Sequence, residues 1–404
     1  MLNKEGAREL AYVARIKDIR PIEGKDRVEC AVVNGWTIMV RKGQFQVGDL
    51  GIYFEIDSRV PATKEFEFLA AKHYKIKTQK YGNFYSQGLL MGAEDFGWVL
   101  RKGNFPDEDV IDTGEGTNGL LAEGDFLTSR LGVVYSVEED NKRKAKSNPD
   151  AKINAALARH PKIAKRWGKT IKKNKFLRKM FILLFGRKKD VRNWPAWVVK
   201  TDEERVQNMP WILEDKSEWI VTEKLDGTST TFTMRRGKFG KYDFYTCSRN
   251  VVFDTPNKAC YYDTNVYVEM GQKYDMENVL KKILDADKSL EWVTIQGETF
   301  GAGIQKRDYG MTDHDFRAFN FITSKDGRWN SREAAEFLAD YGIKWVPILG
   351  ERFVLPDTVE ELLKIATDKS VIDGGMREGL VFRSQDGTKS FKAVSNEFLV
   401  KYHQ

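Results

Sequence analysis

Lys224 is the residue of this chain that is best placed to do covalent chemistry. It lies in the stretch Thr222–Gly227, of sequence TEKLDG, between a strand-like run at 219–221 and a second one at 228–234. A lysine amine attacks a nucleotide phosphate only when it is neutral, and the pKa of a free lysine is about 10.4. A metal ion or a cationic neighbour must therefore lower the pKa of Lys224 if this residue is a nucleophile.

Three residues downstream of Lys224 have the chemistry needed to hold a nucleotide. Arg249 can grip a phosphate through a charge-assisted, two-pronged hydrogen bond. Glu298 can accept hydrogen bonds from ribose hydroxyls, and Phe319 can stack on a purine base. Taken alone, each of these residues could equally be a surface ion pair, a strand-end carboxylate or part of the core.

Three further residues complete the series. Glu378 precedes the apolar run 379–382 and is a hard oxygen ligand of the kind that Mg²⁺ or Mn²⁺ prefers. Lys389 and Lys392 can neutralise negative charge that develops on an α-phosphate. No single residue is diagnostic, but their order after Lys224 predicts a site for nucleotidyl transfer.

This order of motifs resembles the covalent nucleotidyltransferase superfamily, which contains RNA ligases, ATP- or NAD-dependent DNA ligases and mRNA capping enzymes. The resemblance spans residues 223–402 and implies that Lys224 is the residue that ATP adenylates. It implies catalytic roles for Asp226 and Lys392, nucleotide binding by Glu223, Arg249, Glu298, Phe319, Lys389 and Lys392, and metal binding by Glu378 and Asp226.

Two positions depart from the pattern of the superfamily. Asn320 follows Phe319, where the family often has Asp. The last motif of many RNA ligases is Lys-x-Lys, whereas here Ser390 takes the first position and Lys389 lies one residue earlier. The role of Lys389 is therefore left open.

Residues 1–135 have the pattern of a small β-barrel. Strand-like runs at 11–16, 28–33, 36–40 and 50–56 are separated by turns, and Asn34-Gly35 is a strong hairpin signal. Short strands with tight turns are typical of OB folds, which often bind single-stranded nucleic acid. The segment 73–85 is the best candidate for such a surface, because basic and aromatic residues alternate there.

Residues 136–195 form a basic linker with helical runs at 151–158 and 163–185. Residues 141–190 contain 18 Lys or Arg and two acids, a local charge of +16, so the rest of the chain carries 7 − 16 = −9. Such a block favours a polyanionic partner over a merely solvated surface. The apolar segment Met180–Phe185 is too short to span a bilayer and is expected to dock on a domain.

Residues 196–404 show an α+β pattern without regular alternation. Capping boxes are expected at Asn330–Glu333 and Asp357–Glu360, with a helix stop at Gly342. The expected strands are 219–224, 228–234, 242–247, 292–298, 316–322 and 379–383, and the expected helices are 275–284, 332–341 and 358–367.

The domain order narrows the resemblance. Only about a dozen residues follow Lys392, too few for the OB domain that DNA ligases and capping enzymes place there. A barrel before the catalytic domain looks like an RNA ligase of the Naegleria type, and the segment Lys200–Asn208 is similar to one in RNA ligases. Within it, Arg205 and Gln207 are candidates to bind the RNA, as is Arg249, with a helix-terminal ion-pair network as the alternative for the first two.

The resemblance therefore implies an ATP-dependent RNA ligase that uses Mg²⁺ or Mn²⁺ and seals RNA 5′-phosphate and 3′-hydroxyl ends. Its expected fold is multidomain: an OB-like β-barrel, a basic helical linker, and an α+β nucleotidyltransferase domain with ATP-grasp-like antiparallel sheets. A DNA ligase, a capping-type nucleotidyltransferase, and an RNA-binding protein with a vestigial catalytic domain are the alternatives.

The remaining features concern the compartment and the assembly. The cysteines Cys30, Cys247 and Cys260 have neither a disulfide framework nor metal-ligand spacing, which predicts a reducing, cytoplasmic compartment. No apolar run approaches the ~20 residues that span a bilayer. We therefore expect a soluble monomer that acts away from membranes.

Overall fold

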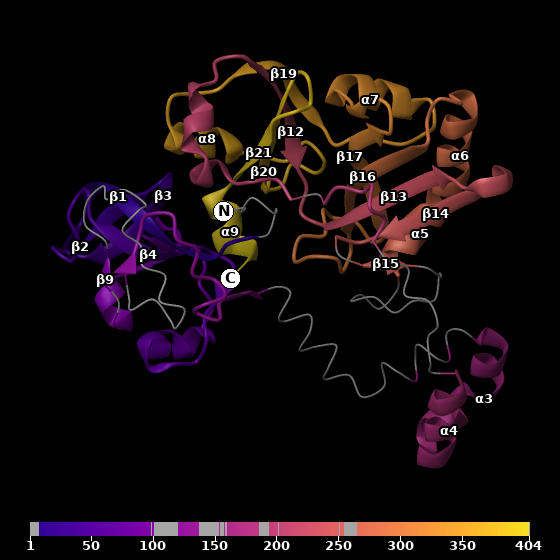
Figure 1. Cartoon of the computed structure of the whole chain (residues 1–404), viewed down its shortest axis with the longest axis horizontal. Helices are drawn as coiled ribbons and strands as arrows, with labels where there is room; N and C mark the ends of the chain where they lie inside the picture. The colour runs from indigo at the N-terminus through magenta and orange to yellow at the C-terminus, as the bar shows by residue number, and fades with distance from the viewer. Residues whose placement is uncertain are drawn as a thin grey trace.

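The chain has three parts in space (Figure 1). An N-terminal β domain and a C-terminal α+β domain lie against each other, while helices α3 and α4 lie apart from both. The structure is a computed structural model. It describes residues 8–97, 99–100, 120–136, 153, 157, 160–185, 194–200, 202–249, 251–253 and 265–403, so Cys260 and much of the expected linker lie outside the described residues.

The N-terminal domain is built on a five-stranded antiparallel sheet of order β3-β2-β1-β4-β8. Its predicted hairpin is confirmed, because Val33 pairs with Trp36 and Asn34 adopts a left-handed φ of 53°. The long strand β1 serves both halves of the sheet, as expected for a small barrel. The strands are β1 (Ala11–Ile22), β2 (Lys25–Val33), β3 (Trp36–Arg41), β4 (Leu50–Phe54) and β8 (Leu89–Met91).

Smaller elements close this domain. The basic and aromatic segment predicted to face nucleic acid includes the hairpin β6–β7, where the Lys80 ammonium lies 5.2 Å from the Tyr85 ring. These elements are β5 (Ser58–Arg59), η1 (Lys64–Lys72), β6 (Gln79–Tyr81), β7 (Phe84–Ser86), η2 (Ala93–Phe96), β9 (Val99–Leu100), β10 (Leu120–Leu121) and β11 (Val134–Tyr135).

The predicted helical run 163–185 is divided into two helices, α3 (Pro161–Lys173) and α4 (Lys175–Phe185). Asn174 breaks the run, because its backbone is extended and its side chain accepts hydrogen bonds from the N–H groups of Phe176 and Leu177. Ile171 and Phe181 share a small core that also includes Ile153 and Leu157.

The prediction that Met180–Phe185 docks on a domain is wrong. Phe181 packs inside the helix pair, whereas Leu183 and Leu184 are exposed.

The C-terminal domain consists of two sheets and five helices among the described residues. The larger sheet has the order β15-β14-β13-β16-β17-β18, and the smaller has the order β19-β12-β20-β21. The helices α6 and α7 cover one face of the larger sheet and share its core. The strands are β12 (Glu218–Lys224), β13 (Thr228–Arg236), β14 (Tyr242–Cys247), β15 (Val252–Phe253), β16 (Trp292–Gly301), β17 (His314–Thr323), β18 (Gly327–Arg328), β19 (Ile348–Val354), β20 (Gly379–Ser384) and β21 (Ser390–Val394).

Three of the five described helices of this domain, α6, α7 and α8, lie where the sequence predicts helices, whereas α5 and α9 were not predicted. The Asn330 side chain accepts hydrogen bonds from the N–H groups of Arg332 and Glu333, as expected. The capping box at Asp357 is wrong by one residue, because Thr358 caps α8 through the N–H of Glu361. The helices are α5 (Val266–Lys273), α6 (Met276–Ala286), α7 (Ser331–Ala339), α8 (Val359–Ala366) and α9 (Asn396–Tyr402), with short turns η4 (Val206–Asn208), η5 (Pro210–Glu214) and η6 (Lys238–Gly240).

The two domains are docked through a polar and apolar interface. The N–H of Gly35 donates to the carbonyl of Gln207 at 2.8 Å, and the Trp36 indole donates to Asn208 at 2.6 Å. Gln87 donates to Asn396 of α9 at 2.8 Å. In Figure 1, α9 accordingly lies between the two domains. Of the helices that the structure describes, none has the length and apolar character needed to cross a membrane.

Candidate active site

Strand pairing places Lys224 opposite the first residue of β20. Lys224 pairs with Gly379, and the preceding residue, Glu378, forms an ion pair with the Lys224 amine at 2.8 Å. Two residues back along β12, Thr222 pairs with Val381, which pairs in turn with Lys392. The two lysines therefore belong to one small sheet, on strands separated by β20 and offset by two residues along the ladder.

Two glycines allow the backbone to pack closely at this point. A Cβ on Gly227 would lie 2.3 Å from the carbonyl of Thr299, and one on Gly379 would lie 2.2 Å from the carbonyl of Ala393. No side chain fits at either position. Gly227 therefore lets the turn after Lys224 pass over β16, next to Glu298.

Carboxylates dominate the Lys224 end of the site. Burial raises the pKa of Glu298 to about 8, the Lys224 ammonium opposes this rise, and Glu378 adds to it. Burial alone would lower the pKa of Lys224, but Glu378 and Glu298 raise it above its ordinary value. Asp226 is 4% exposed, and its Oδ2 is buried without a hydrogen-bond partner. These carboxylates therefore favour the ammonium form of Lys224.

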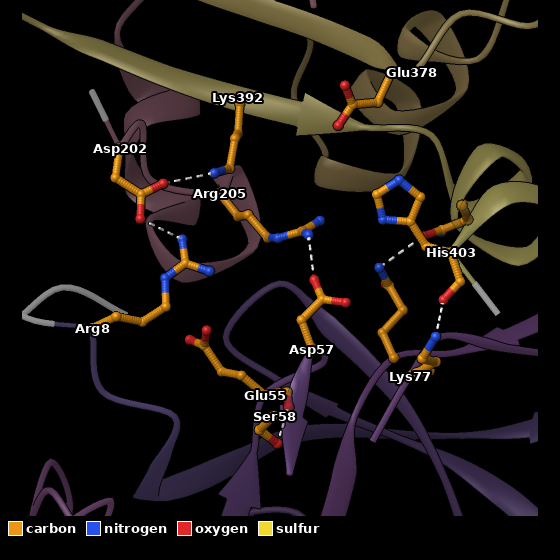
Figure 2. A network of polar contacts seen from close by, with 12 residues as sticks. Arg8, Glu55, Asp57, Ser58, Lys77, Asp202, Arg205, Glu378, Lys392 and His403 are labelled. Atoms are coloured by element: carbon orange, nitrogen blue, oxygen red, sulfur yellow. Dashed lines mark hydrogen bonds and ion pairs between the residues drawn. The ribbon is translucent and has the colours of Figure 1, made fainter. Parts of the chain in front are cut away.

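Cations dominate the Lys392 end. The Lys392 amine lies 3.2 Å from Asp202, whose other oxygen lies 3.2 Å from Arg8 (Figure 2). Burial lowers the pKa of Lys392 to about 8, with Asp202 opposing and the guanidinium groups of Arg8 and Arg205 adding to the effect. Burial disfavours the Asp202 carboxylate, yet Lys392 and Arg8 hold its pKa well below the usual range.

Two further arginines border this end. Arg205 is buried and donates to Asp57 of the N-terminal domain at 3.2 Å, while its Nη1 is buried without a partner (Figure 2). The Arg249 residue is exposed overall. Partial desolvation lowers the pKa of its guanidinium, but Asp202, Tyr135 and Glu298 outweigh this and raise the pKa above its ordinary value. Both guanidinium groups are therefore available to an anion at this end.

A β-bulge directs Phe319. Gln296 pairs with Asn320 and Gly297 pairs with Ala318, so Phe319 is the extra residue of β17. Its ring is half-buried and lies 5.9 Å from the Arg383 guanidinium. Asn320, at the position where the superfamily often has Asp, donates to Gln296 at 2.9 Å and is buried.

Three expected residues are not brought to these two clusters. Lys389 pairs with Asp215 at the surface at 2.8 Å, because it is three residues from Lys392 and so lies on the other face of the sheet. Glu223 accepts a hydrogen bond from the N–H of Val371, with its second oxygen buried and unpartnered. Gln207 is fully buried at the domain interface, where neither polar atom of its side chain has a hydrogen-bond partner.

The structure adds residues that sequence reasoning missed. The Nε2 of His403 lies 3.4 Å from Asp226. Burial lowers the pKa of this imidazole, but Asp226 outweighs burial and raises the pKa. Tyr309 accepts a hydrogen bond from the Asp226 N–H at 2.6 Å. Arg8 and Asp202 complete the Lys392 cluster. Asp202 lies in the quoted segment Lys200–Asn208, but the others had no signal in the sequence.

The site thus has an acidic end and a basic end. The acidic end contains Asp226, Glu298 and Glu378 around one ammonium, which suits a cation. The basic end contains unpaired donor capacity on Arg205, which suits phosphate. In the described part of the chain, no group of three or more Asp, Glu, His or Cys side chains is arranged so that together they could hold a metal ion.

Comparisons with known proteins agree with this architecture. Residues 217–403 match the RNA ligase family, and residues 10–93 match a family described as an OB-fold domain. A structure of the Naegleria gruberi RNA ligase with pyrophosphate is 27% identical, with a TM-score of 0.68, and the match covers 98% of this chain and 99% of that one.

Mutant forms of the same Naegleria gruberi enzyme also match. One, solved with ATP and Mn, is 25% identical with a TM-score of 0.69 and coverage of 98% and 100%. Another, solved with AMP and Mn, is 26% identical with a TM-score of 0.68 and coverage of 98% and 99%. No curated protein sequence matches the chain.

Proposed function

Because residues 217–403 match the RNA ligase family and the whole chain has the fold of an RNA ligase, we propose that it is an ATP-dependent RNA ligase. It joins a 5′-phosphate to a 3′-hydroxyl through a lysyl-AMP intermediate. The observation that carries the proposal is the Lys224–Glu378 ion pair at 2.8 Å, since it sets the expected nucleophile beside an expected metal ligand.

The reaction has three displacements at phosphorus. First, the neutral Lys224 amine attacks the α-phosphorus of ATP, a nitrogen–phosphorus bond forms, and pyrophosphate leaves. Next, an oxygen of the RNA 5′-phosphate attacks the same phosphorus, which breaks that bond and frees Lys224. Last, the RNA 3′-hydroxyl attacks the 5′-phosphorus, loses its proton, and AMP leaves.

The residues at the acidic end fit a divalent cation. The Oδ2 of Asp226 is buried with no hydrogen-bond partner, and burial, with a smaller contribution from Glu378, raises the pKa of Glu298 to about 8. Mg²⁺ and Mn²⁺ are held by one or two carboxylates and several waters, so Asp226 and Glu378 suffice. Such an ion, when bound, supplies positive charge that weakens the hold of Glu378 on the Lys224 proton.

The basic end would hold the phosphates. Lys392 is positioned to bind an α-phosphate oxygen, and Arg205 and Arg249 add guanidinium donors. Phe319 would pack against the adenine, and Glu298 would accept hydrogen bonds from the ribose. Glu223, with its unpartnered buried oxygen, is our candidate for recognition of the adenine edge.

RNA would reach this site from the basic surfaces of the chain. The hairpin β6–β7 and helices α3 and α4 present lysines, and residues 160–185 contain no Asp or Glu. We also propose a monomer in the cytoplasm, where the buried thiol of Cys30 stays reduced. Light scattering of the purified protein tests the monomer.

One assay tests the proposal. The protein is incubated with Mn²⁺ and ATP labelled at the α-phosphate, then chased with nicked duplexes that carry 5′-phosphorylated RNA or DNA. We expect a labelled protein adduct that Lys224→Ala abolishes and that a 5′-phosphorylated end discharges. Sealing of that activated end should then require an RNA 3′-hydroxyl. Lys389→Ala, on the other face of the sheet, is the matched control.

Each contrary outcome has a defined meaning. An adduct that persists in Lys224→Ala refutes the nucleophile. Labelling by GTP or NAD in place of ATP, or sealing of DNA 3′-hydroxyl ends alone, identifies a different nucleotidyltransferase. Salt-sensitive RNA binding without any adduct identifies a binding protein with an inactive catalytic domain.

A further inference from the structure

We propose that His403 is a positioning residue for Asp226 and that the N-terminal domain holds His403 in place. The inference rests on the proposed function. It concerns a contact between the imidazole, at the end of α9, and a carboxylate two residues after Lys224.

The Asp226 side chain is buried but weakly anchored. Its Oδ1 lies 3.4 Å from the His403 Nε2, while its Oδ2 is buried with no hydrogen-bond partner. The hydrogen bond to the Tyr309 hydroxyl involves only the backbone N–H of Asp226, not its carboxylate. Within the described residues, the imidazole is thus the polar group that fixes which way this carboxylate turns. It engages one oxygen and leaves the other free for the reaction.

His403 is itself held from both domains. Its N–H donates to the carbonyl of Leu399 at 3.0 Å, which continues α9. Its carbonyl accepts a hydrogen bond from the Lys77 amine of the N-terminal domain. Figure 2 shows Lys77 rising from that domain toward His403. The ring also packs on Phe398, with centroids 5.7 Å apart.

Helix α9 is docked on the N-terminal domain independently of Lys77. Asn396 accepts a hydrogen bond from Gln87 at 2.8 Å. Leu399 is 4% exposed and belongs to the core cluster that contains Tyr12 and Trp36. The docking of the N-terminal domain therefore sets the position of α9, and through His403 the orientation of Asp226.

This arrangement predicts a particular kinetic defect. A carboxylate displaced by about 1 Å can slow a positioned reaction by up to ~10²-fold. Removal of the imidazole should thus slow lysyl-AMP formation by roughly 10- to 100-fold and weaken binding of the cation. The ATP concentration for half-maximal rate should stay within about twofold, since the phosphate-binding residues are untouched.

The experiment compares His403→Ala with His403→Gln in the full-length chain. The amide of Gln donates a hydrogen bond over a similar reach, so it should restore most of the lost rate. Lys77→Met should give an intermediate loss of about 3- to 10-fold, because α9 keeps its other contacts. His314→Ala and Lys42→Met are the matched controls, since His314 pairs with Glu269 away from Asp226 and Lys42 is exposed.

Three readouts separate positioning from folding. Single-turnover adduct formation gives the rate, electron paramagnetic resonance of free Mn²⁺ gives cation affinity without catalysis, and thermal melting reports the fold. We expect His403→Ala to be slow, to bind Mn²⁺ more weakly, and to melt like the unmodified protein.

Two results would overturn the inference: an unchanged rate and Mn²⁺ affinity in His403→Ala, or no recovery in His403→Gln. A chain that forms no adduct at all contradicts the proposed function instead. The Mn²⁺ titrations of the variants still decide the role of His403 in that case.

Discussion

Lys224 and Lys392 lie in one four-stranded sheet, yet their surroundings have opposite charge. Lys224 sits among Asp226, Glu298 and Glu378, which raise its pKa despite burial. Burial among Arg8 and Arg205 lowers the pKa of Lys392 to about 8, although Asp202 opposes this. The neighbours, not the residue type, set the charge of each amine.

The difference explains why the substrate must be a nucleotide together with a cation. The acidic end is relieved by positive charge and the basic end by negative charge, so an ATP–metal complex complements both. Under the proposed function, the Lys224 amine becomes reactive only when Glu378 and Glu298 no longer hold its proton. The free protein therefore holds Lys224 protonated and protects it from reaction.

The largest expected effect comes from removing Glu378 from the acidic end. Glu378→Gln removes the ion pair with Lys224 and one expected metal ligand, so adduct formation should fall by on the order of 10²- to 10³-fold. The Mn²⁺ concentration for half-maximal rate should rise. Quenched time courses of adduct formation at a series of Mn²⁺ concentrations measure the rate and the half-maximal Mn²⁺ concentration. Replacement of the exposed Glu336 by Gln is the control. A normal rate at low Mn²⁺ would contradict the cation role of this end.

The next effect comes from the basic end. Lys392→Ala should slow adduct formation by about 10²-fold, because one charge on the α-phosphate is lost. Lys392→Arg keeps that charge and should retain most of the activity. Equal losses in both variants would mean that shape, and not charge, matters at Lys392.

Lys392 also predicts how ATP binding depends on pH. Its pKa of about 8 means that the amine is charged below pH 8 and loses its charge as the pH rises through 8. ATP should thus bind more weakly at pH 9 than at pH 7 in a Lys224→Ala background. Lys392→Arg should flatten this trend, since an arginine stays charged throughout. Titration calorimetry at several pH values measures the affinity for ATP. An affinity that does not change with pH while Lys392 is present would contradict the prediction.

A smaller effect is expected at Phe319. Stacking of a base on an aromatic ring contributes ~1–3 kcal/mol, so Phe319→Leu should raise the ATP concentration for half-maximal rate by roughly tenfold. Phe319→Tyr should be close to normal. Steady-state measurements decide it, and an unchanged value for Phe319→Leu would place the adenine elsewhere.

The smallest effect on adenylation is expected outside the site. Helices α3 and α4 carry lysines without acidic partners, in contrast to both ends of the site. Replacing Lys162, Lys165, Lys169 and Lys172 with Gln should leave adduct formation unchanged. RNA affinity should fall, and its logarithmic salt dependence should shrink by about 0.7–0.9 for each RNA phosphate that the helices no longer neutralise. Filter binding at several salt concentrations measures this, and an unchanged slope would exclude these helices.

The sequence predicted the sheets well because strand periodicity is local. Strands β12, β13 and β14 begin within one residue of the predicted positions. The order of the motifs also singled out both Lys224 and Glu378, which are in contact although 154 residues separate them; their ion pair itself was not predicted. The position of Lys389 was harder to predict, because the motif gives only its distance along the sequence. Which face of the sheet a side chain takes depends on the alternation of side chains along the strand.

Other features could not be predicted from local patterns. The single long basic helix is two helices because one side chain, that of Asn174, caps the second. Arg8, Lys77 and His403 reach the site from opposite ends of the chain, and Lys77 and His403 are 326 residues apart. Only tertiary packing brings such residues together, so no spacing could have indicated them.

The packing of α9 on the N-terminal domain has a consequence for biosynthesis. Gln87 and Asn396 are 309 residues apart, so at roughly 5–20 residues per second a ribosome needs about 15–60 s to make the second after the first. During that time the apolar surface around Tyr12 and Trp36 waits for Leu399. The nascent N-terminal domain therefore exposes apolar surface to which chaperones can bind. The same domain produced alone would expose this surface permanently and would tend to aggregate.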